Sequence, residues 1–144
     1  MNGKKSLIAL AIAITTLDAL AALPLPAGGD TASVERVAET TDLYTADDIE
    51  TAFDAIESEF RTGFGGCELE ELRYDARVES MHLDEILGHG KKGDGDLIVV
   101  LSEFTTDWRA ADEGFSPNDR YEDWQWILTR PSQGAPWNVV DWGY

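Results

Sequence analysis

The chain has 144 residues, a length that accommodates a single domain. It carries 28 acidic and 11 basic residues, so its formal charge is −17, and most of its surface would repel a nucleic-acid backbone or an anionic membrane. Because Cys67 is the only cysteine, the chain cannot form an internal disulfide framework or a cysteine-based zinc site.

The first predicted element, residues 1–21, has the layout of a secretory signal peptide. Two lysines precede an uncharged, largely apolar run from 7 to 17, and small residues lead up to Ala21. We expect cleavage after Ala21, with Ala22 as the alternative, and therefore a secreted or extracytoplasmic protein. A retained anchor is the competing interpretation, but the run is shorter than the roughly 20 apolar residues that span a membrane. No cysteine directly follows the run, which argues against anchoring through a lipid.

Residues 22–42 are rich in alanine, glycine, threonine and proline and poor in large apolar side chains. This composition favours a linker or a loosely held arm, with a short helix as an option at 33–39. The folded domain is therefore expected to comprise residues 43–144.

An amphipathic helix is predicted from Ala46 to Phe60. Thr45 is suited to the N-cap position, and two aspartates in the first turn complement the helix dipole. Large apolar residues recur at spacings of four, three and four, which gives the helix one face to bury: Ile49, Phe53, Ile56 and Phe60. Three glycines between 63 and 66 end the helix, because each one adds backbone entropy that a helix must lose.

The remaining elements are predicted to be strands. Residues 67–76 indicate a strand with a bulge or an irregular start, and a helix is the alternative. Residues 97–101 are apolar on both faces and rich in β-branched side chains, which predicts a central strand. Residues 124–130 and 137–142 indicate two more strands, joined by a hairpin loop with a proline at each end. A helix followed by antiparallel strands predicts an α+β fold.

Four segments carry a resemblance to a known family: Cys67-x-Leu69-x-x-Leu72-x-Tyr74-Asp75, Ile98-Val99-Val100-Leu101-Ser102-x-Phe104, Pro117-Asn118-x-x-Tyr121-x-x-Trp124-x-Trp126-Ile127-Leu128-x-Arg130 and Gly134-x-x-Trp137-x-Val139-x-x-Trp142-Gly143-Tyr144. They resemble an uncharacterised family of small exported or lipid-anchored proteins of Gram-positive bacteria. The resemblance covers residues 43–144 and implies an NTF2-like (cystatin-like) cone, in which an N-terminal helix packs on a curved antiparallel sheet. It implies no activity, and the chain lacks the anchoring cysteine of the lipid-anchored members.

Strand alternation indicates one candidate site. If Arg130 pairs with Trp137, continued pairing places Asp141 opposite Trp126 and on the same face as Trp124. We expect Trp124, Trp126 and Asp141 to bind a ligand. Desolvation among tryptophans would favour the protonated form of Asp141 and suit it to general acid or base chemistry. In the competing interpretation the tryptophans belong to the core, and Asp141 is a rim residue or pairs with an arginine.

Two segments contain residue types that bind metals. His82, Glu85 and His89 would share one face of a helix at a spacing acceptable for zinc, but the glycines that follow disfavour a long helix, so a polar surface segment is predicted. The oxygen-rich segment 112–119, with the acidic pair 122–123 after it, is of the kind that calcium uses. It does not follow the EF-hand spacing, and a tight turn is the simpler interpretation. We therefore predict no metal and no cofactor.

The sequence predicts a binding protein more strongly than an enzyme. Cys67, Ser102 and Ser116 have no histidine at an interpretable position, and Cys67 is expected to be a small buried hydrophobic residue. We predict a ligand-binding or interaction module for a small molecule or an extracellular protein, with membrane contact only through an uncleaved N-terminus. A homodimer is compatible with this prediction. The alternatives are a small lyase, isomerase or hydrolase that uses Asp141, and a calcium-stabilised structural module.

Overall fold

The computed structural model describes residues 27–87 and 95–144, and for residues 82–87 it describes the backbone alone. The expected signal peptide, residues 1–21, lies outside the described residues. So does His89 of the zinc alternative, and the side chains of His82 and Glu85 also lie outside what is described. No helix among the described residues is both long enough and apolar enough to cross a membrane.

The described residues form an α+β fold with a five-stranded mixed sheet, as the sequence predicts at the level of fold class. Strands follow the chain in the order β1-β2-β3-β4-β5; β1 is parallel to β2, and the other pairs are antiparallel. The elements are β1 (Glu35–Ala38), α2 (Ala46–Gly63), β2 (Cys67–Tyr74), α3 (Ala76–Leu87), β3 (Asp96–Thr106), the 3-10 helix η1 (Trp108–Glu113), β4 (Arg120–Arg130) and β5 (Asn138–Gly143).

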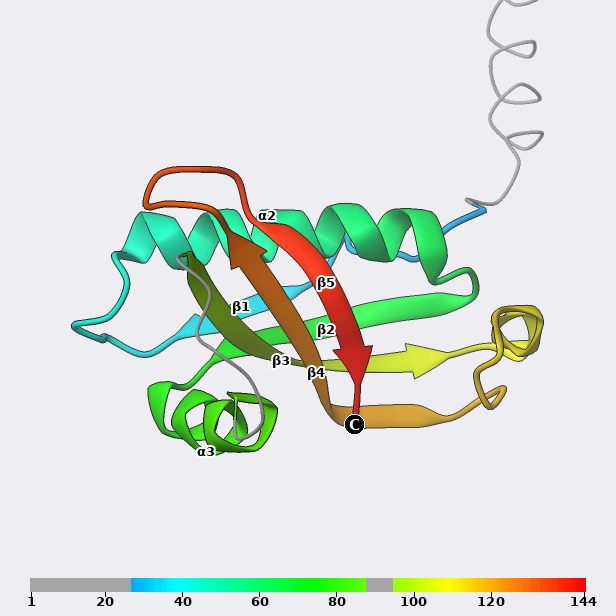
Figure 1. Cartoon of the computed structure of the whole chain (residues 1–144). Helices are drawn as coiled ribbons and strands as arrows, with labels where there is room; N and C mark the ends of the chain where they lie inside the picture. The colour runs from blue at the N-terminus through cyan, green and yellow to red at the C-terminus, as the bar shows by residue number, and fades with distance from the viewer. Residues whose placement is uncertain (1–26, 88–94) are drawn as a thin grey trace, which may run out of the picture.

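Helix α2 covers one face of a strongly twisted sheet, and α3 lies on the other side of the strands in the view of Figure 1. The predicted apolar stripe of α2 is confirmed, because its four members are at most 2% exposed and belong to the main core: Ile49, Phe53, Ile56 and Phe60. Thr45 caps the helix as predicted. Its hydroxyl accepts the Asp48 N–H at 3.1 Å, and the Asp48 carboxylate accepts the Thr45 N–H at 2.9 Å.

The predictions for the strands are largely confirmed. Strand β3 is the middle strand of the five, and β2 has a register shift between Leu69 and Glu71, which matches the expected irregularity. The two C-terminal strands form the expected hairpin, although β4 already begins at Arg120.

Residues 22–42 were expected to form a linker, and this is wrong for the part that contains residues 35–38. The short helix considered for 33–39 does not form either. Residues 35–38 form strand β1, and Asp30 makes an isolated parallel bridge with Glu68. A short segment of low strand propensity becomes a strand here because β2 offers its backbone an edge to pair with. The helix is therefore not the first element, and the sheet is mixed rather than purely antiparallel.

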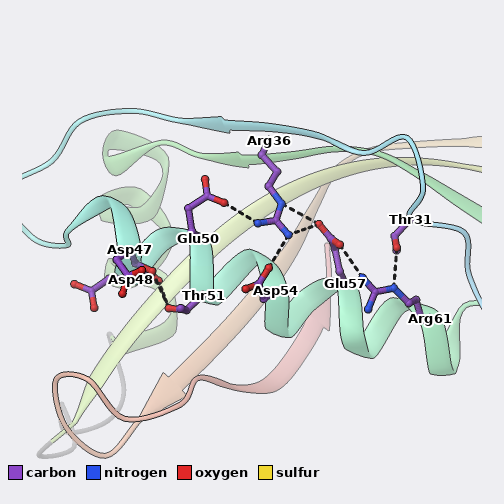
Figure 2. A network of polar contacts seen from close by, with 9 residues as sticks. All are labelled: Thr31, Arg36, Asp47, Asp48, Glu50, Thr51, Asp54, Glu57 and Arg61. Atoms are coloured by element: carbon purple, nitrogen blue, oxygen red, sulfur yellow. Dashed lines mark hydrogen bonds and ion pairs between the residues drawn. The ribbon is translucent and has the colours of Figure 1, made fainter.

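An ion-pair network explains how this edge strand is held. Arg36 of β1 reaches over α2 and binds three carboxylates, at 2.6 Å from Glu50, 2.7 Å from Asp54 and 2.6 Å from Glu57 (Figure 2). Burial lowers the pKa of Arg36, but the hydrogen bonds to these carboxylates outweigh it and raise the pKa above its ordinary value. Arg61 binds Glu57 as well, at 2.9 Å, so that one helix face and the first strand form a single network.

Helix α3 contradicts the expectation that glycines disfavour a long helix around His82. Twelve residues are helical, because the helix-favouring stretch from Ala76 to Leu87 ends before the first glycine at position 88. Asp75 starts the helix, since its carboxylate accepts the N–H of Arg77 at 2.8 Å. The sequence interpretation gave too much weight to the glycines, which follow the helix and do not interrupt it.

A buried arginine links the start of α2 to strands β3 and β4. The side chain of Arg130, at the end of β4, is 3% exposed and binds Asp48 of α2 at 2.7 Å and Asp96 of β3 at 2.8 Å. Its guanidinium lies 4.2 Å from the centre of the Trp137 ring, whose Nε1–H donates to the Asp48 carbonyl at 2.9 Å. The hydrogen bond from Arg130, followed by that from the Thr45 backbone, lowers the pKa of Asp48.

Truncation of the α2 stripe tests this core. We expect Phe53→Ala to lower the free energy of unfolding by about 3 to 5 kcal/mol, because it removes a fully buried aromatic ring and leaves a cavity. Chemical denaturation measures the loss. Ser58→Ala, at an exposed position of the same helix, is the control and should change stability by less than about 0.5 kcal/mol. A loss below about 1 kcal/mol for Phe53→Ala would show that this face is not core.

Candidate functional site

The pairing of β4 with β5 differs from the predicted register. Leu128 pairs with Val139 as expected, but Ile127 then pairs with Asp141, because Val140 is an extra residue in β5. The predicted pairing of Trp126 with Asp141 is therefore wrong, and Trp126 pairs with Trp142 instead.

This one-residue bulge reverses the faces of the end of β5. Trp142 turns toward the core, where its ring centre lies 5.8 Å from that of Trp126 and 6.0 Å from that of Phe64. A regular ladder would place the Asp141 carboxylate among these rings, and desolvation of the carboxylate would destabilise the fold. The bulge places the Trp142 ring there instead, and its partial burial stabilises the fold. Alternation alone does not predict such a bulge.

The three predicted site residues thus lie in three different environments. Trp126 is fully buried, and its Nε1–H donates to Ser102 Oγ at 2.8 Å, so it is a core residue. Asp141 is exposed, and its carboxylate accepts the N–H of Trp142 at 2.9 Å. Trp124 is partly buried, and its Nε1–H has no hydrogen-bond partner in the structure. The structure does not bring Asp141 together with the two tryptophans.

An aromatic surface where β4 begins and β5 ends does include Trp124. We name it the aromatic ledge, and it consists of Phe115, Tyr121, Trp124, Trp142 and Tyr144. The ring centres of Trp124 and Tyr144 are 5.2 Å apart, and those of Phe115 and Trp124 are 5.8 Å apart. Phe115 also stacks on Phe64 at 5.2 Å, and Trp142 packs on the same ring, so Phe64 connects the two parts of the ledge. Trp142 is 42% exposed and Tyr144 is 76% exposed.

A second bulge builds the other side of the ledge. Ser102 pairs with Trp124 and Phe104 with Tyr121, so β4 carries an extra residue between these pairs, and there Asp123 has a φ of 54°. Aspartate tolerates this left-handed conformation better than most side chains. Strand β4 bends sharply along its length in Figure 1. The bulge keeps Tyr121 and Trp124 in edge-to-face contact, with ring centres 5.6 Å apart.

The surroundings of the ledge are acidic. Partial burial, the neighbouring Tyr121 and the carboxylates of Asp119 and Asp123 raise the pKa of the Tyr144 hydroxyl. Asp141 lies on the same strand as Trp142. The two arginines of this region are engaged with carboxylates: Arg73 binds Asp123 at 2.7 Å, whereas Arg120 binds Glu70, Glu103 and Glu122. The ledge therefore presents aromatic rings beside an excess of negative charge.

The described part of the chain does not contain the metal sites that the sequence analysis considered as alternatives. Within residues 27–87 and 95–144, no group of three or more His, Cys, Asp or Glu side chains could hold a metal ion. The segment proposed for calcium instead contains the end of η1 and a turn at 117–118, where Asn118 has a φ of 53°. Cys67 is buried as expected, and burial, with smaller effects from nearby carboxylates, raises the pKa of its thiol to about 12.

Three hollows among the described residues do not coincide with the predicted site. Three open hollows have volumes of about 210, 310 and 410 Å³. The largest of these lies between the start of α2 and the 134–137 segment, with Asp48, Arg130 and Trp137 in its wall. Trp124 and Asp141 line none of the three. This arrangement gives no support to the small pocket enzyme that uses Asp141.

A buried carboxyl group that sequence reasoning missed lies under α3. Glu79 is 1% exposed, and among the residues whose side chains the structure describes neither of its carboxyl oxygens has a hydrogen-bond partner. Burial raises the pKa of Glu79 to about 7, although Tyr74, the Val99 backbone and Tyr44 are close enough to oppose the shift. The Tyr74 hydroxyl is also buried without a partner. No sequence signal marks Glu79, because an acidic residue in the first turn of a helix is ordinarily a solvated partner of the helix dipole.

Comparison of the chain with models of protein families, with curated proteins and with solved structures finds no match.

The buried carboxyl of Glu79 predicts a pH-dependent stability. The unfolded chain releases this proton near pH 4.5 and the folded chain near pH 7, so stability falls as the pH rises through this interval, by about 3 kcal/mol in total. We expect Glu79→Gln to remove this fall. Its free energy of unfolding should approach that of the unmodified protein at about pH 4 and exceed it by about 3 kcal/mol at about pH 8.

Denaturant titrations across this pH range measure the effect, with Glu35→Gln at an exposed position as the control. The control should keep the pH dependence of the unmodified protein. If Glu79→Gln keeps it as well, Glu79 is not a buried, protonated group.

Proposed function

We propose that this protein is an exported, acidic interaction module that binds an extended cationic segment of an extracellular protein on the aromatic ledge. The observation that carries the proposal is the exposure of Trp142, on the edge strand β5, and of Tyr144, which directly follows that strand, in an acidic part of the surface. Exposed aromatic side chains of this size are typical of interaction surfaces, where they supply much contact area for little loss of side-chain entropy.

Strand β5 offers backbone groups to such a segment. It pairs with β4 on one side, and no other strand among the described residues pairs with its outer edge. An extended peptide can add to an open edge of this kind and gain main-chain hydrogen bonds. The Asp141 carboxylate now accepts the Trp142 N–H, and this side-chain contact restricts promiscuous pairing at the edge. A bound segment would take over this N–H and leave Asp141 to pair with a cation.

The chemistry of the ledge favours arginine or lysine in the bound segment. A guanidinium or ammonium group is attracted to the faces of tryptophan and tyrosine rings. The same group gains from the negative charge of Asp119, which lies next to the start of β4 and close to Tyr144. The protein itself shows this contact inside its core, where the Arg130 guanidinium lies 4.2 Å from the Trp137 ring centre. Anionic segments would be repelled by the formal charge of −17.

Export and the finer fold description are part of the proposal. The signal-peptide layout of residues 1–21 supports export, and binding then takes place outside the cytoplasm. A long helix across one face of a twisted sheet supports an NTF2-like cone, whereas the parallel strand β1 departs from the antiparallel sheet that the resemblance implies. Strand addition at β5 depends neither on export nor on an NTF2-like fold.

A peptide titration tests the proposal. The probe is a twelve-residue peptide of alternating arginine and valine, and binding is followed by isothermal titration calorimetry at low and high salt. We expect saturable binding that weakens with salt, because charge pairs contribute to it. Trp142→Ala and Tyr144→Ala should each cost about 1 to 2 kcal/mol of binding free energy. Trp108→Ala is the matched control, since Trp108 is 71% exposed but lies on η1, outside the ledge, and should not change the affinity.

Three outcomes would contradict the proposal. The first is equal binding of an alternating glutamate and valine peptide, which would indicate unspecific strand pairing. The second is an equal loss of affinity in Trp108→Ala and Trp142→Ala, which would place binding elsewhere. The third is an unmodified protein that does not bind the cationic peptide at all, or that instead forms a dimer through β5 in sedimentation analysis.

A further inference from the structure

Helix α3 is docked on the sheet by an acidic side chain. Among the α3 side chains that the structure describes, residues 76–81, Glu79 is the buried one, at 1% exposed, whereas Met81 is 74% exposed. A helix that packs against a protein core ordinarily inserts an apolar side chain at such a position. Because the charge of a carboxyl group depends on pH, the docking of α3 depends on a proton.

The groups that face Glu79 come from three elements. Tyr74 belongs to β2, Tyr44 to the segment before α2, and the Val99 backbone to β3. The Tyr44 hydroxyl donates to the carbonyl of Leu97, so its proton is already used. No hydrogen bond from any of these groups reaches the carboxyl oxygens. The cluster is therefore able to hold a neutral carboxyl group but does not solvate a charged one.

No described arginine or lysine compensates a charge on Glu79. Arg130, whose charge acts on Tyr44, is bound by Asp48 and Asp96, and the charge of Asp96 acts on Tyr44 as well. On α3 itself, Arg77 is 82% exposed and lies 3.6 Å from the carboxylate of Asp75, at the start of the helix. An ionised Glu79 would be a buried charge without a partner, which costs several kcal/mol.

We propose that α3 is a proton-controlled element, docked on β3 while Glu79 is protonated and detached as Glu79 ionises, so that the sheet surface at Val99 becomes accessible. Detachment hydrates the carboxylate at a smaller cost than global unfolding, because most of the hydrophobic core lies on the α2 side of the sheet. The raised pKa of Glu79 gives the direction: acid favours the docked helix. Between about pH 4.5 and about pH 7 the docked form alone keeps the proton, so the opening equilibrium rises by up to about tenfold per pH unit.

Amide hydrogen exchange of the full chain tests this proposal, with rates corrected for the intrinsic pH dependence of exchange. We expect the protection of residues 76–87 to fall by at least about tenfold between about pH 5 and about pH 8. The protection of α3 should lie below that of α2 at every pH and should depend little on denaturant, because α3 opens while α2 stays folded. The protection of α2 should fall only as far as the global stability falls in the denaturant titrations. In Glu79→Gln, which cannot ionise, the protection of α3 should be the same at both pH values. His82→Gln is the matched control on the same helix and should keep the fall.

Each other result overturns the proposal. Equal protection of α2 and α3 with the same denaturant dependence would show that α3 opens only in global unfolding, and unchanged protection of α3 between the two pH values would show that the helix stays docked. A fall that persists in Glu79→Gln, or one that disappears in His82→Gln, would assign the proton to another group. Should Glu79→Gln fail to fold, the comparison of α2 with α3 in the unmodified protein still decides between local and global opening.

Discussion

The ion pairs of Arg130 with Asp48 and Asp96 are the interaction on which the rest of this fold depends. A guanidinium that is buried to this degree must be paired, since one without a partner would cost several kcal/mol. The pairs connect the start of α2, the start of β3 and the end of β4, and Trp137 closes the site by binding both the guanidinium and the Asp48 carbonyl. They therefore fix the point from which β5 begins.

The aromatic ledge follows from that starting point through two local irregularities. With Trp137 held, the Val140 bulge turns Trp142 toward the aromatic core and Asp141 outward. The bulge at Asp123 does the same for β4 and keeps Tyr121 and Trp124 in contact. A regular hairpin would turn the Asp141 carboxylate toward the aromatic core and the Trp142 ring away from it. Bulges of this kind are common where a strand must re-aim a side chain, and here they gather the rings on one face and leave the Asp141 carboxylate on the other.

The sequence predicts those elements whose hydrophobic pattern is strong and local. The stripe of α2 and the β-branched run in β3 each specify their own burial, so helix and central strand follow without tertiary information. Strand β1 has no such pattern, because its place depends on β2 and on Arg36, which binds carboxylates 14 to 21 residues away. Helix α3 was missed because glycines that follow a helix were taken as glycines within it. The resemblance to an NTF2-like family also implies a purely antiparallel sheet, which the parallel β1 does not fit.

The candidate site was predicted in part, for a physical reason that one residue illustrates. The aromatic residues of β4 were correctly placed on one face, and Leu128 was correctly paired with Val139. Beyond Val139 the pattern Val-Asp-Trp admits both a regular ladder and a bulge, and only the packing of Trp142 on Phe64 and Trp126 distinguishes them. The burial of Glu79 could not be predicted from the sequence, since it depends on how α3 docks and not on the neighbours of Glu79 in the chain.

A double-mutant cycle on Asp48 and Arg130 tests the central claim most directly. Asp48→Asn, Arg130→Met and the combined variant are compared by denaturant unfolding at neutral pH. We predict that Arg130→Met loses about 3 to 5 kcal/mol, because it leaves Asp48 without its counter-charge, and that Asp48→Asn loses less, because Arg130 keeps its ion pair with Asp96. The combined variant should lose less than the sum by at least about 1 kcal/mol. Additive losses within about 0.5 kcal/mol would contradict the account, since they would show that the pair does not hold α2 and the sheet together.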